Sequence, residues 1–169
     1  MSEDDDKPRI WISEFALERM RQLAQLHFPL ETGGMLIGYV GDNGEPVVNN
    51  VIGPGPKARH GRFKFVPDGW YQQEVLEKIF LKTEGRETYL GDWHTHPKGG
   101  NCPSYIDKIT LAKIAHEPAS GTKHPIMAIL GDGTPIWKIG VVRFFSARGI
   151  ILRHYKVTEL TPIIYTEPH

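Results

Sequence analysis

The segment Trp93-His94-Thr95-His96-Pro97 carries the residue types in this chain that are best suited to chemistry. In a β-strand, residues i and i+2 point to the same face. The imidazoles of His94 and His96 therefore project together, at a spacing that lets them share one metal ion, and Pro97 ends the strand directly after them. Taken alone, the pair is a weak pattern, because such histidines also lie on solvated faces or make ordinary hydrogen bonds.

A carboxylate follows at Asp107, one turn inside a helix that Ser104 is expected to begin. Two histidines, one carboxylate and an open fourth position make the ligand arrangement of a catalytic zinc ion. Ser104-x-x-Asp107 is also a capping box, which begins a helix without any catalysis. Considered alone, Ser104 is better explained as a cap. The two interpretations are compatible, because a helix start can also hold a ligand rigidly.

Glu31 stands just before Gly33-Gly34 and a short apolar segment. Zinc hydrolysis needs a base that takes a proton from water and returns it to the leaving amine. Glu31 could serve if the strand after it packs beside the strand that carries His94. Without the two histidines, a surface glutamate before a turn would be the favoured interpretation.

An irregular basic loop follows Gly53-Pro54-Gly55-Pro56. It is interpreted equally well as a solvated loop and as a rim on which an extended substrate tail docks, since such tails can add as a strand to an exposed edge. The residues of the docking rim would be Lys57, Arg59, His60, Arg62 and Lys64.

Other candidate chemistries have less support. Cys102 is the only cysteine, which excludes an intramolecular disulfide and a cysteine-rich zinc knuckle. It lies between the candidate ligands and could touch the metal, but a cysteine–histidine nucleophile explains none of their spacing. His116 and His124 flank a short loop and lack the cysteines of a second metal site. The His-x-Glu and Pro-Cys-x-x-Cys elements of a zinc deaminase are absent.

Apolar periodicity and turn residues predict about three helices on a sheet of mixed direction, an α/β or α+β layered domain. Trp70 and Trp93 are expected in its core. Helices are expected from Ser13 to before Pro29, from Pro67-Asp68 to Gly85, and from Ser104 to Ala115. Strands are expected at residues 9–12, 35–40, 47–52, 88–93, 125–130, 136–145 and 150–157, with the second and third forming a hairpin.

Length and charge narrow the function classes. The chain has 169 residues, enough for one domain, and its 20 Lys plus Arg balance 20 Asp plus Glu. A net charge of zero argues against bulk nucleic-acid binding and against an anionic membrane as partner. The longest apolar run, residues 126–130, is too short to span a membrane. The N-terminus is acidic rather than signal-like, so we expect a cytoplasmic protein with a flexible N-terminus (1–8), one domain (9–160) and a C-terminal tail (161–169).

The site residues together resemble a known signature. Glu31, then His94-x-His96, then ten residues, then Asp107, with Ser104 three places before the aspartate, is similar to the JAMM motif of the JAB/MPN+ zinc metallopeptidases. Glu-Thr-Gly-Gly before an apolar strand agrees as well, and so does Gly-Asp-Trp-His-Thr-His-Pro before Pro-Ser-x-x-Asp. The resemblance covers most of the chain, and the five-residue spacing is specific.

The resemblance implies an MPN domain, a mixed sheet flanked by helices with a cytidine-deaminase-like layout. It implies a zinc ion held by His94, His96 and Asp107 with water as the fourth ligand. Glu31 would be the general acid and base, and Ser104 would donate a hydrogen bond to the oxyanion or hold the water. The family cleaves peptide or isopeptide bonds after the C-terminal tail of ubiquitin or ubiquitin-like proteins. All five signature positions are intact, which argues against an inactive scaffold.

Within the family, the short layout looks like bacterial JAB peptidases encoded beside E1-like and E2-like enzymes in anti-phage operons. One such set conjugates a cyclic-oligonucleotide synthase to its targets, and the JAB member reverses that conjugation. A related set uses a true ubiquitin-like protein. Two further hypotheses stay open: a processing peptidase for a ubiquitin-like or sulfur-carrier precursor, and a non-catalytic interaction module of the MPN type.

Overall fold

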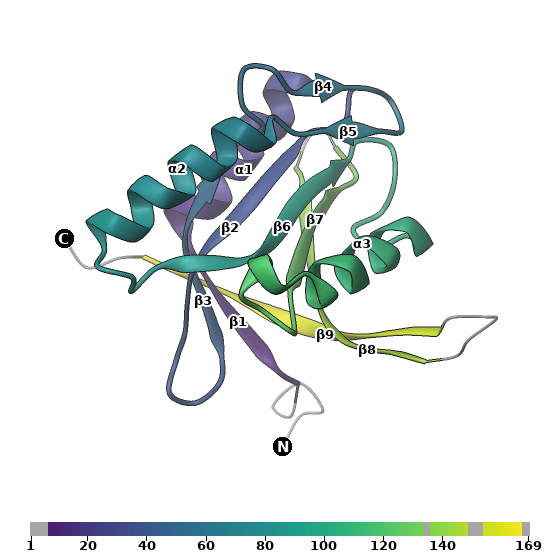
Figure 1. Cartoon of the computed structure of the whole chain (residues 1–169). Helices are drawn as coiled ribbons and strands as arrows, with labels where there is room; N and C mark the ends of the chain where they lie inside the picture. Colours follow the sequence, from purple (N-terminus) through teal and green to yellow (C-terminus); the bar gives the residue numbers. More distant parts are fainter. Residues whose placement is uncertain (1–6, 134–135, 149–153, 167–169) are drawn as a thin grey trace.

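The computed structural model describes residues 7–133, 136–148 and 154–166. Three α-helices pack on a mixed sheet of seven strands that closes on itself, in the order β1-β3-β2-β6-β7-β8-β9 with β9 returning to β1. The helices are α1 (Glu14–His27), α2 (Gly69–Lys82) and α3 (Tyr105–His116). The sheet strands are β1 (Arg9–Ser13), β2 (Gly33–Val40), β3 (Pro46–Ile52), β6 (Thr88–His96), β7 (Ile126–Gly131), β8 (Lys138–Arg148) and β9 (His154–Tyr165) (Figure 1).

The α/β class, the three helices and the mixed sheet agree with the sequence analysis. β1 runs parallel to β3 and β9, and β6 runs parallel to β7, while the remaining neighbours are antiparallel. The sheet is a closed barrel in this structure, a closure that periodicity within single strands does not reveal because it depends on which edges meet.

Helix caps agree closely with the expected boundaries. The Ser13 side chain accepts a hydrogen bond from the Ala16 N–H, and Asp68 accepts one from the Tyr71 N–H. Each cap satisfies a donor that the first helical turn leaves without a partner. The third helix begins with a full capping box at Ser104 and Asp107.

The C-terminal strand and the supposed irregular loop differ most from what the sequence predicts. β9 continues through Tyr165 and pairs with β1, so residues 161–165 belong to the sheet rather than to a C-terminal tail. The supposed irregular loop contains a small separate hairpin of β4 (Arg59–His60) and β5 (Phe65–Val66). Residues 1–6 of the expected N-terminal segment and 150–153 of the last expected strand lie outside the described residues.

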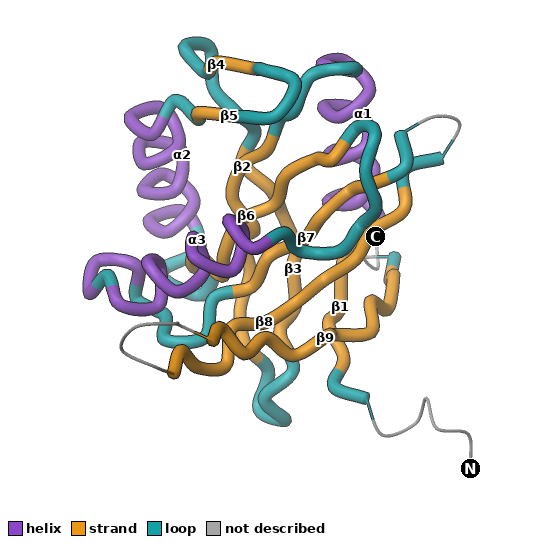
Figure 2. Tube along the Cα trace, turned by 90° about the vertical axis from the view of Figure 1, so that its right-hand side faces the viewer, coloured by secondary structure: helices purple, strands orange, loops and turns teal. Residues whose placement is uncertain are grey.

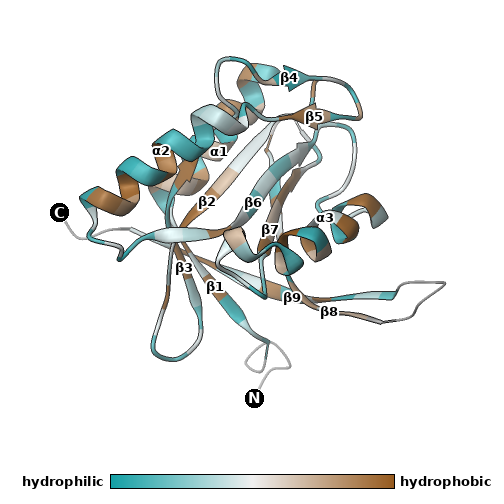
Figure 3. Cartoon of the chain, viewed as in Figure 1, coloured by the Kyte–Doolittle hydropathy of each residue, from teal (hydrophilic) through white to brown (hydrophobic). Residues whose placement is uncertain are grey.

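The sheet separates α1 from the other two helices. Figure 2 shows α1 on one side of the strands and α2 with α3 on the other. Apolar side chains of α1 pack in a core with Leu36, Trp93 and Leu130 of the sheet, whereas Leu111 of α3 packs in a second cluster that includes Ile129. β2 and β7 carry apolar colours, while the end of β6 is hydrophilic (Figure 3).

The two tryptophans expected in the core have different surroundings. Trp93 is buried, and its indole N–H donates to the Ile52 carbonyl at 3.2 Å. Trp70 is 85% exposed at the start of α2, so the expectation that it belongs to the core is wrong. α2 covers the sheet only loosely, with Gln72 as its one buried residue, and its Leu76 and Phe80 line a hollow. No helix among the described residues has the length and apolar character that a membrane span requires.

A close approach between strands predicts the effect of one substitution. Gly91 of β6 has φ of 151°, and a Cβ there would lie 1.9 Å from the Ile126 carbonyl oxygen of β7. Gly91→Ala should therefore lower the free energy of unfolding by about 2 kcal/mol or more in urea denaturation. Gly69→Ala is the matched control, since nothing lies within 4 Å of a Cβ there. Equal unfolding midpoints for the two variants would contradict the packing described for β6.

Candidate metal centre and active site

The end of β6 presents two histidines on one face of the sheet. Trp93 and Thr95 point to the core and are buried, while His94 and His96 alternate with them and line a hollow of about 660 Å³. The Nε2 atoms of the two imidazoles lie 3.0 Å apart. The strand alternation expected from the sequence therefore brings the rings together at a single point.

Asp107 completes the cluster from the first turn of α3. Its Oδ1 lies 3.1 Å from His94 Nε2, and its Oδ2 lies 3.4 Å from His96 Nε2. The three residues form a group whose ligand atoms all lie within 4.8 Å of one another. Ligands about 2.0–2.1 Å from a tetrahedral metal ion stand roughly 3.3 Å from each other, so this spacing fits one ion bound by all three.

Neighbouring groups fix the orientation of these ligands. The Gly100 carbonyl lies 3.2 Å from His96 Nδ1, so Nδ1 donates to it and Nε2 is the ring atom left to bind a metal ion. Asp107 Oδ2 accepts a hydrogen bond of 2.6 Å from the Ser104 N–H. The capping box therefore serves the cluster as well as the helix, because it holds the carboxylate in place.

The electrostatics of the cluster are those of a charged carboxylate beside imidazoles. Burial alone would raise the pKa of Asp107, but hydrogen bonds from His94 and His96 pull it well below its usual range. The hydrogen bond to Asp107 is the main cause that raises the pKa of His96. Asp107 is thus anionic at neutral pH and provides the negative charge that a divalent cation needs.

Glu31 lies across the hollow from α3. It lines the same hollow as the two histidines and Asp107. Burial is the main cause that raises the pKa of the Glu31 carboxyl, and Asp107 adds to the effect while His94 and His96 oppose it. A carboxyl group with a raised pKa is better suited to exchange protons near neutral pH.

The segment that carries Glu31 is tied directly to the segment of the histidines. Gly33 of β2 pairs with His94 of β6. The Thr32 N–H donates to Thr95 Oγ1 at 3.0 Å, and the Thr95 N–H donates to the Thr32 carbonyl at 2.9 Å. Continuing that register places Glu31 alongside His96, so the condition set in the sequence analysis, that the two strands pack side by side, is met.

Glycine is required at the point of contact between the strands. A Cβ at Gly33 would lie 2.4 Å from the Trp93 carbonyl oxygen, and one at Gly34 would lie 1.8 Å from the Ile52 carbonyl oxygen. Both distances are far below any ordinary contact, so larger residues would push β2 away from its neighbours. The Glu-Thr-Gly-Gly segment is thus explained by the packing that positions Glu31.

The basic residues of the expected docking rim have separate surroundings. Arg62 and Lys64 line hollows beside the site. Lys57 and Arg59 are exposed and line neither hollow, while His60 is half-buried and turns toward Glu31. Between Arg62 and Lys64, the Phe63 side chain is 92% exposed and borders both hollows. The sequence analysis did not single out Phe63.

Two further residues escaped the sequence analysis. Thr95 is fully buried between the ligand histidines. Strand alternation predicts that its side chain faces the core, where a hydroxyl needs a hydrogen-bond partner. That need was the signal for its contact with Thr32. Asp92 lines the hollow two places before His94 and accepts a hydrogen bond from the Tyr89 hydroxyl at 2.9 Å. Burial raises the pKa of Asp92 to about 6. An acidic residue in that strand gave no indication of such a pairing.

The remaining candidates have structural surroundings. Cys102 is exposed. His116 Nδ1 lies 2.6 Å from the Ala112 carbonyl, and His124 Nδ1 lies 3.1 Å from the Phe144 carbonyl. Each ring is therefore engaged with the backbone. Within the described part of the chain, His94, His96 and Asp107 are the one group found that could hold a metal ion.

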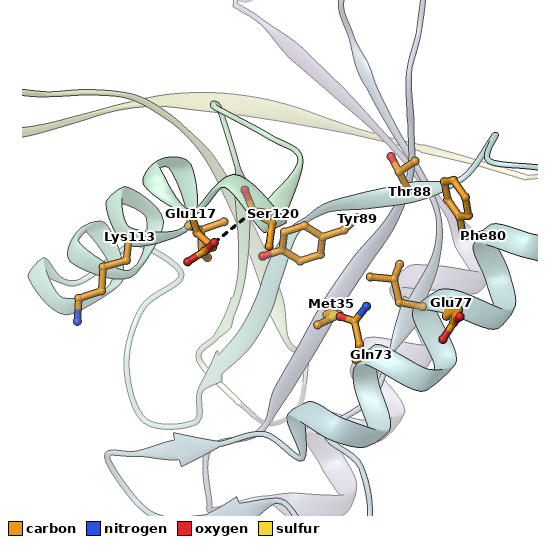
Figure 4. A pocket seen from close by; sticks show the side chains of 12 residues that line it. Met35, Gln73, Glu77, Phe80, Thr88, Tyr89, Lys113, Glu117 and Ser120 are labelled. Atoms are coloured by element: carbon orange, nitrogen blue, oxygen red, sulfur yellow. Dashed lines mark hydrogen bonds between the residues drawn. The ribbon is translucent and has the colours of Figure 1, made fainter.

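A larger hollow of about 910 Å³ lies over the first half of β6. Side chains from α2, including Phe80, face Lys113 and Glu117 across Tyr89 of β6 (Figure 4). Tyr89 lines this hollow, while its hydrogen-bond partner Asp92 lines the hollow of the metal cluster. The two hollows are therefore neighbours over one strand, with α2 and α3 lining both.

The fold and the site define a class: an α/β protein whose strand end and helix start build a metal site of the hydrolytic type. A family model of prokaryotic homologs of the JAB domain matches residues 13–146. The chain therefore belongs to that family, and the resemblance drawn from the motif is confirmed.

Relatives of the chain carry the names of peptidases. The chain is 34% identical over 129 residues to a probable metalloprotease of Sinorhizobium fredii, a match that covers 76% of this chain and 79% of the relative. It is 31% identical over 132 residues to a CD-NTase/cGAS isopeptidase of Escherichia coli, covering 76% and 80%. These names agree with the JAMM-type peptidase that the motif predicts.

The fold itself has a solved counterpart. The structure of a Desulfitobacterium hafniense protein determined in solution superposes with a TM-score of 0.65 at 22% identity, covering 94% of each chain. This likeness covers more of the chain than the matched domain segment does. It concerns the fold alone.

The cluster predicts stoichiometric metal binding. We expect one divalent ion per chain by elemental analysis after purification, and a melting temperature that falls when a chelator removes it, because an ion that binds only the folded state stabilises it. Asp107→Asn should lose most of the bound metal, whereas Asp42→Asn in an exposed turn should retain it. Equal metal content in the two variants would rule out Asp107 as a ligand.

Proposed function

We propose that this protein is a zinc-dependent isopeptidase that cleaves after the C-terminus of a ubiquitin-like protein, or of a protein conjugated by E1-like and E2-like enzymes. It would thereby reverse conjugation. The observation that carries the proposal is the convergence of His94, His96 and Asp107 on one point with Glu31 in the same hollow. The isopeptidase named among its relatives supports this substrate class.

Zinc is the metal that the donor set fits best. Two imidazoles and one carboxylate with an open fourth position are typical of catalytic zinc, and softer or larger ions prefer thiolates or more oxygens. When bound, zinc would supply Lewis-acid chemistry, lowering the pKa of a water molecule to about 7 and polarising the scissile carbonyl. His94, His96 and Asp107 would hold the ion.

Glu31 would move the proton. Its carboxylate takes a proton from the attacking water and returns it to the leaving amine, which must be protonated to depart. Burial helps, because it raises the pKa of the Glu31 carboxyl toward the range in which the group both accepts and donates a proton. The tie between Thr32 and Thr95 keeps the glutamate beside the histidines during this exchange.

Ser104 would stabilise the developing oxyanion. Its Oγ already accepts a hydrogen bond from the Asp107 N–H at 3.2 Å, so its hydroxyl hydrogen is left to donate elsewhere. Ser104 lines the same hollow as the metal cluster. A donor aimed at the position where negative charge develops lowers the barrier more than it strengthens substrate binding.

The hollows suit an extended chain rather than a folded loop. Phe63 of the β4–β5 turn and Ile106 of α3 both line the hollow of the metal cluster and are 92% and 72% exposed. A flexible C-terminal tail can lie between such walls and continue along β6 toward the larger hollow. Arg62 and Lys64 would contact the modifier beside the tail.

We place this reaction in the cytoplasm and in anti-phage defence, beside E1-like and E2-like partners encoded by neighbouring genes. The balanced net charge gives no support for a nucleic-acid partner. A reporter joined to the C-terminus of a CD-NTase, either linearly or through a lysine isopeptide, tests the reaction class. Faster cleavage of the lysine-linked reporter supports deconjugation, and faster cleavage of the linear one supports precursor processing.

Glu31→Gln provides the sharpest test of the mechanism. Because the amide cannot exchange protons, turnover of the reporter should fall by roughly 10²–10⁴ while metal content and melting temperature stay at the wild-type values. Glu18→Gln, an exposed glutamate of α1 that lines none of the hollows described above, is the matched control. Near-full turnover by Glu31→Gln would remove this residue from the mechanism.

Ser104 has two roles that substitutions can separate. Ser104→Ala should cost about 1 kcal/mol of stability through the lost cap and about 3 kcal/mol of transition-state stabilisation. Ser104→Asp keeps a capping oxygen but, as a carboxylate, has no hydrogen to donate, so it should melt near the wild-type temperature and remain impaired in turnover. If Ser104→Asp is as active as the wild type, the serine is a cap only.

A further inference from the structure

The β4–β5 hairpin hydrogen-bonds to the backbone of Glu31 from the side opposite to Thr95. The Glu31 N–H donates to the Gly61 carbonyl at 2.8 Å. The Glu31 carbonyl in turn lies 3.0 Å from Nδ1 of His60. Both polar groups of the Glu31 peptide backbone are thus engaged by two adjacent residues of one hairpin.

The direction of the His60 bond is fixed by chemistry. A carbonyl oxygen only accepts, so Nδ1 of His60 must carry the hydrogen and donate it. The ring is also held in place by its neighbours. It stacks on His27 with centroids 3.8 Å apart and planes 12° from parallel, and it lies 5.5 Å from the Phe65 ring. Burial, and then the neighbouring His60, lower the pKa of His27.

These contacts give His60 a different task from the other basic residues of the loop. Arg62 and Lys64 are exposed. The ring of His60 is half-buried, with one face against His27 and Nδ1 committed to Glu31. A ring held in this way is poorly placed to dock a substrate and well placed to fix the backbone beside it.

We propose that His60 is a positioning residue for Glu31: its ring, locked by the stack on His27, donates to the Glu31 carbonyl and sets where the carboxylate stands relative to the metal cluster. The proposal depends on the function proposed above, in which Glu31 moves the proton. Displacing a catalytic group by about 1 Å can cost roughly a hundredfold in rate. The hydrogen bond to Thr95 fixes only Thr32, the residue that follows Glu31.

Two substitutions separate the hydrogen bond from the ring. His60→Phe keeps a flat ring for the stack but has no donor, and His60→Asn offers an amide N–H near the position of Nδ1. With the CD-NTase-linked reporter, His60→Phe should lower kcat roughly tenfold to a hundredfold with KM and metal content unchanged. His60→Asn should recover most of that kcat. Hydrogen exchange at the Glu31 amide should accelerate in His60→Phe and stay slow in His60→Asn.

The same substitution made in the Glu31→Gln variant shows whether His60 acts through Glu31. In Glu31→Gln, adding His60→Phe should lower kcat no further, because the group being positioned has already lost its function. A raised KM with unchanged kcat would overturn the proposal in favour of docking. A lowered melting temperature with unchanged kcat would overturn it in favour of a purely structural role.

The amide exchange also separates this proposal from the proposed function. If Glu31→Gln alone retains full turnover, the proposed mechanism fails, and accelerated exchange in His60→Phe still reports that His60 holds Glu31. If Glu31→Gln is inactive but exchange at the Glu31 amide is the same in His60→Phe and wild type, the mechanism stands and the positioning role of His60 is refuted.

Discussion

The close contact between β2 and β6 is the constraint on which the site depends. The two strands approach so tightly that Gly33 leaves no room for a Cβ, and the pair Thr32 and Thr95 locks the segment before β2 to the end of β6. This single contact converts two distant stretches of sequence into neighbours. It brings the glutamate before one strand beside the histidines that end the other.

Along β6, alternate side chains face opposite sides of the sheet and have different roles. Trp93 and Thr95 face the core, where the indole is anchored on Ile52 and the hydroxyl on Thr32. His94 and His96 face the opposite side, where α3 delivers Asp107. Because every second residue is buried, the histidines stand on a rigid strand rather than on a loop. Rigid placement matters, since ligand and base geometry must hold within a fraction of an ångström.

The β4–β5 hairpin contributes to the surroundings of the cluster in two ways. The hairpin is small and carries exposed cationic and aromatic side chains, yet His60 of β4 and the adjacent Gly61 hydrogen-bond to the Glu31 backbone. The same element therefore borders the hollow of the metal cluster and holds the segment that carries Glu31. The larger hollow lies over the same strand and is also lined by α2 and α3.

The sequence by itself determined the local features. The period of apolar residues predicted the three helices, cap residues predicted their starts, and the spacing of His94, His96, Ser104 and Asp107 predicted the cluster. Each of these depends on interactions within a few residues, or on a spacing that one strand or one helical turn fixes. The exposed position of Trp70 shows the limit of such local prediction, because the apolar character of a residue does not reveal which other segment, if any, packs against it.

Only the tertiary structure decided what depends on contacts between distant segments. The closure of the barrel through β9 and β1, the strand pairing of residues 161–165, and the β4–β5 hairpin all require edges to meet that no local pattern specifies. The same holds for His60. Its sequence position beside arginines and lysines indicated a basic surface, whereas the fold turns its ring inward onto His27 and Glu31, because a side chain's partners are set by the path of the whole chain.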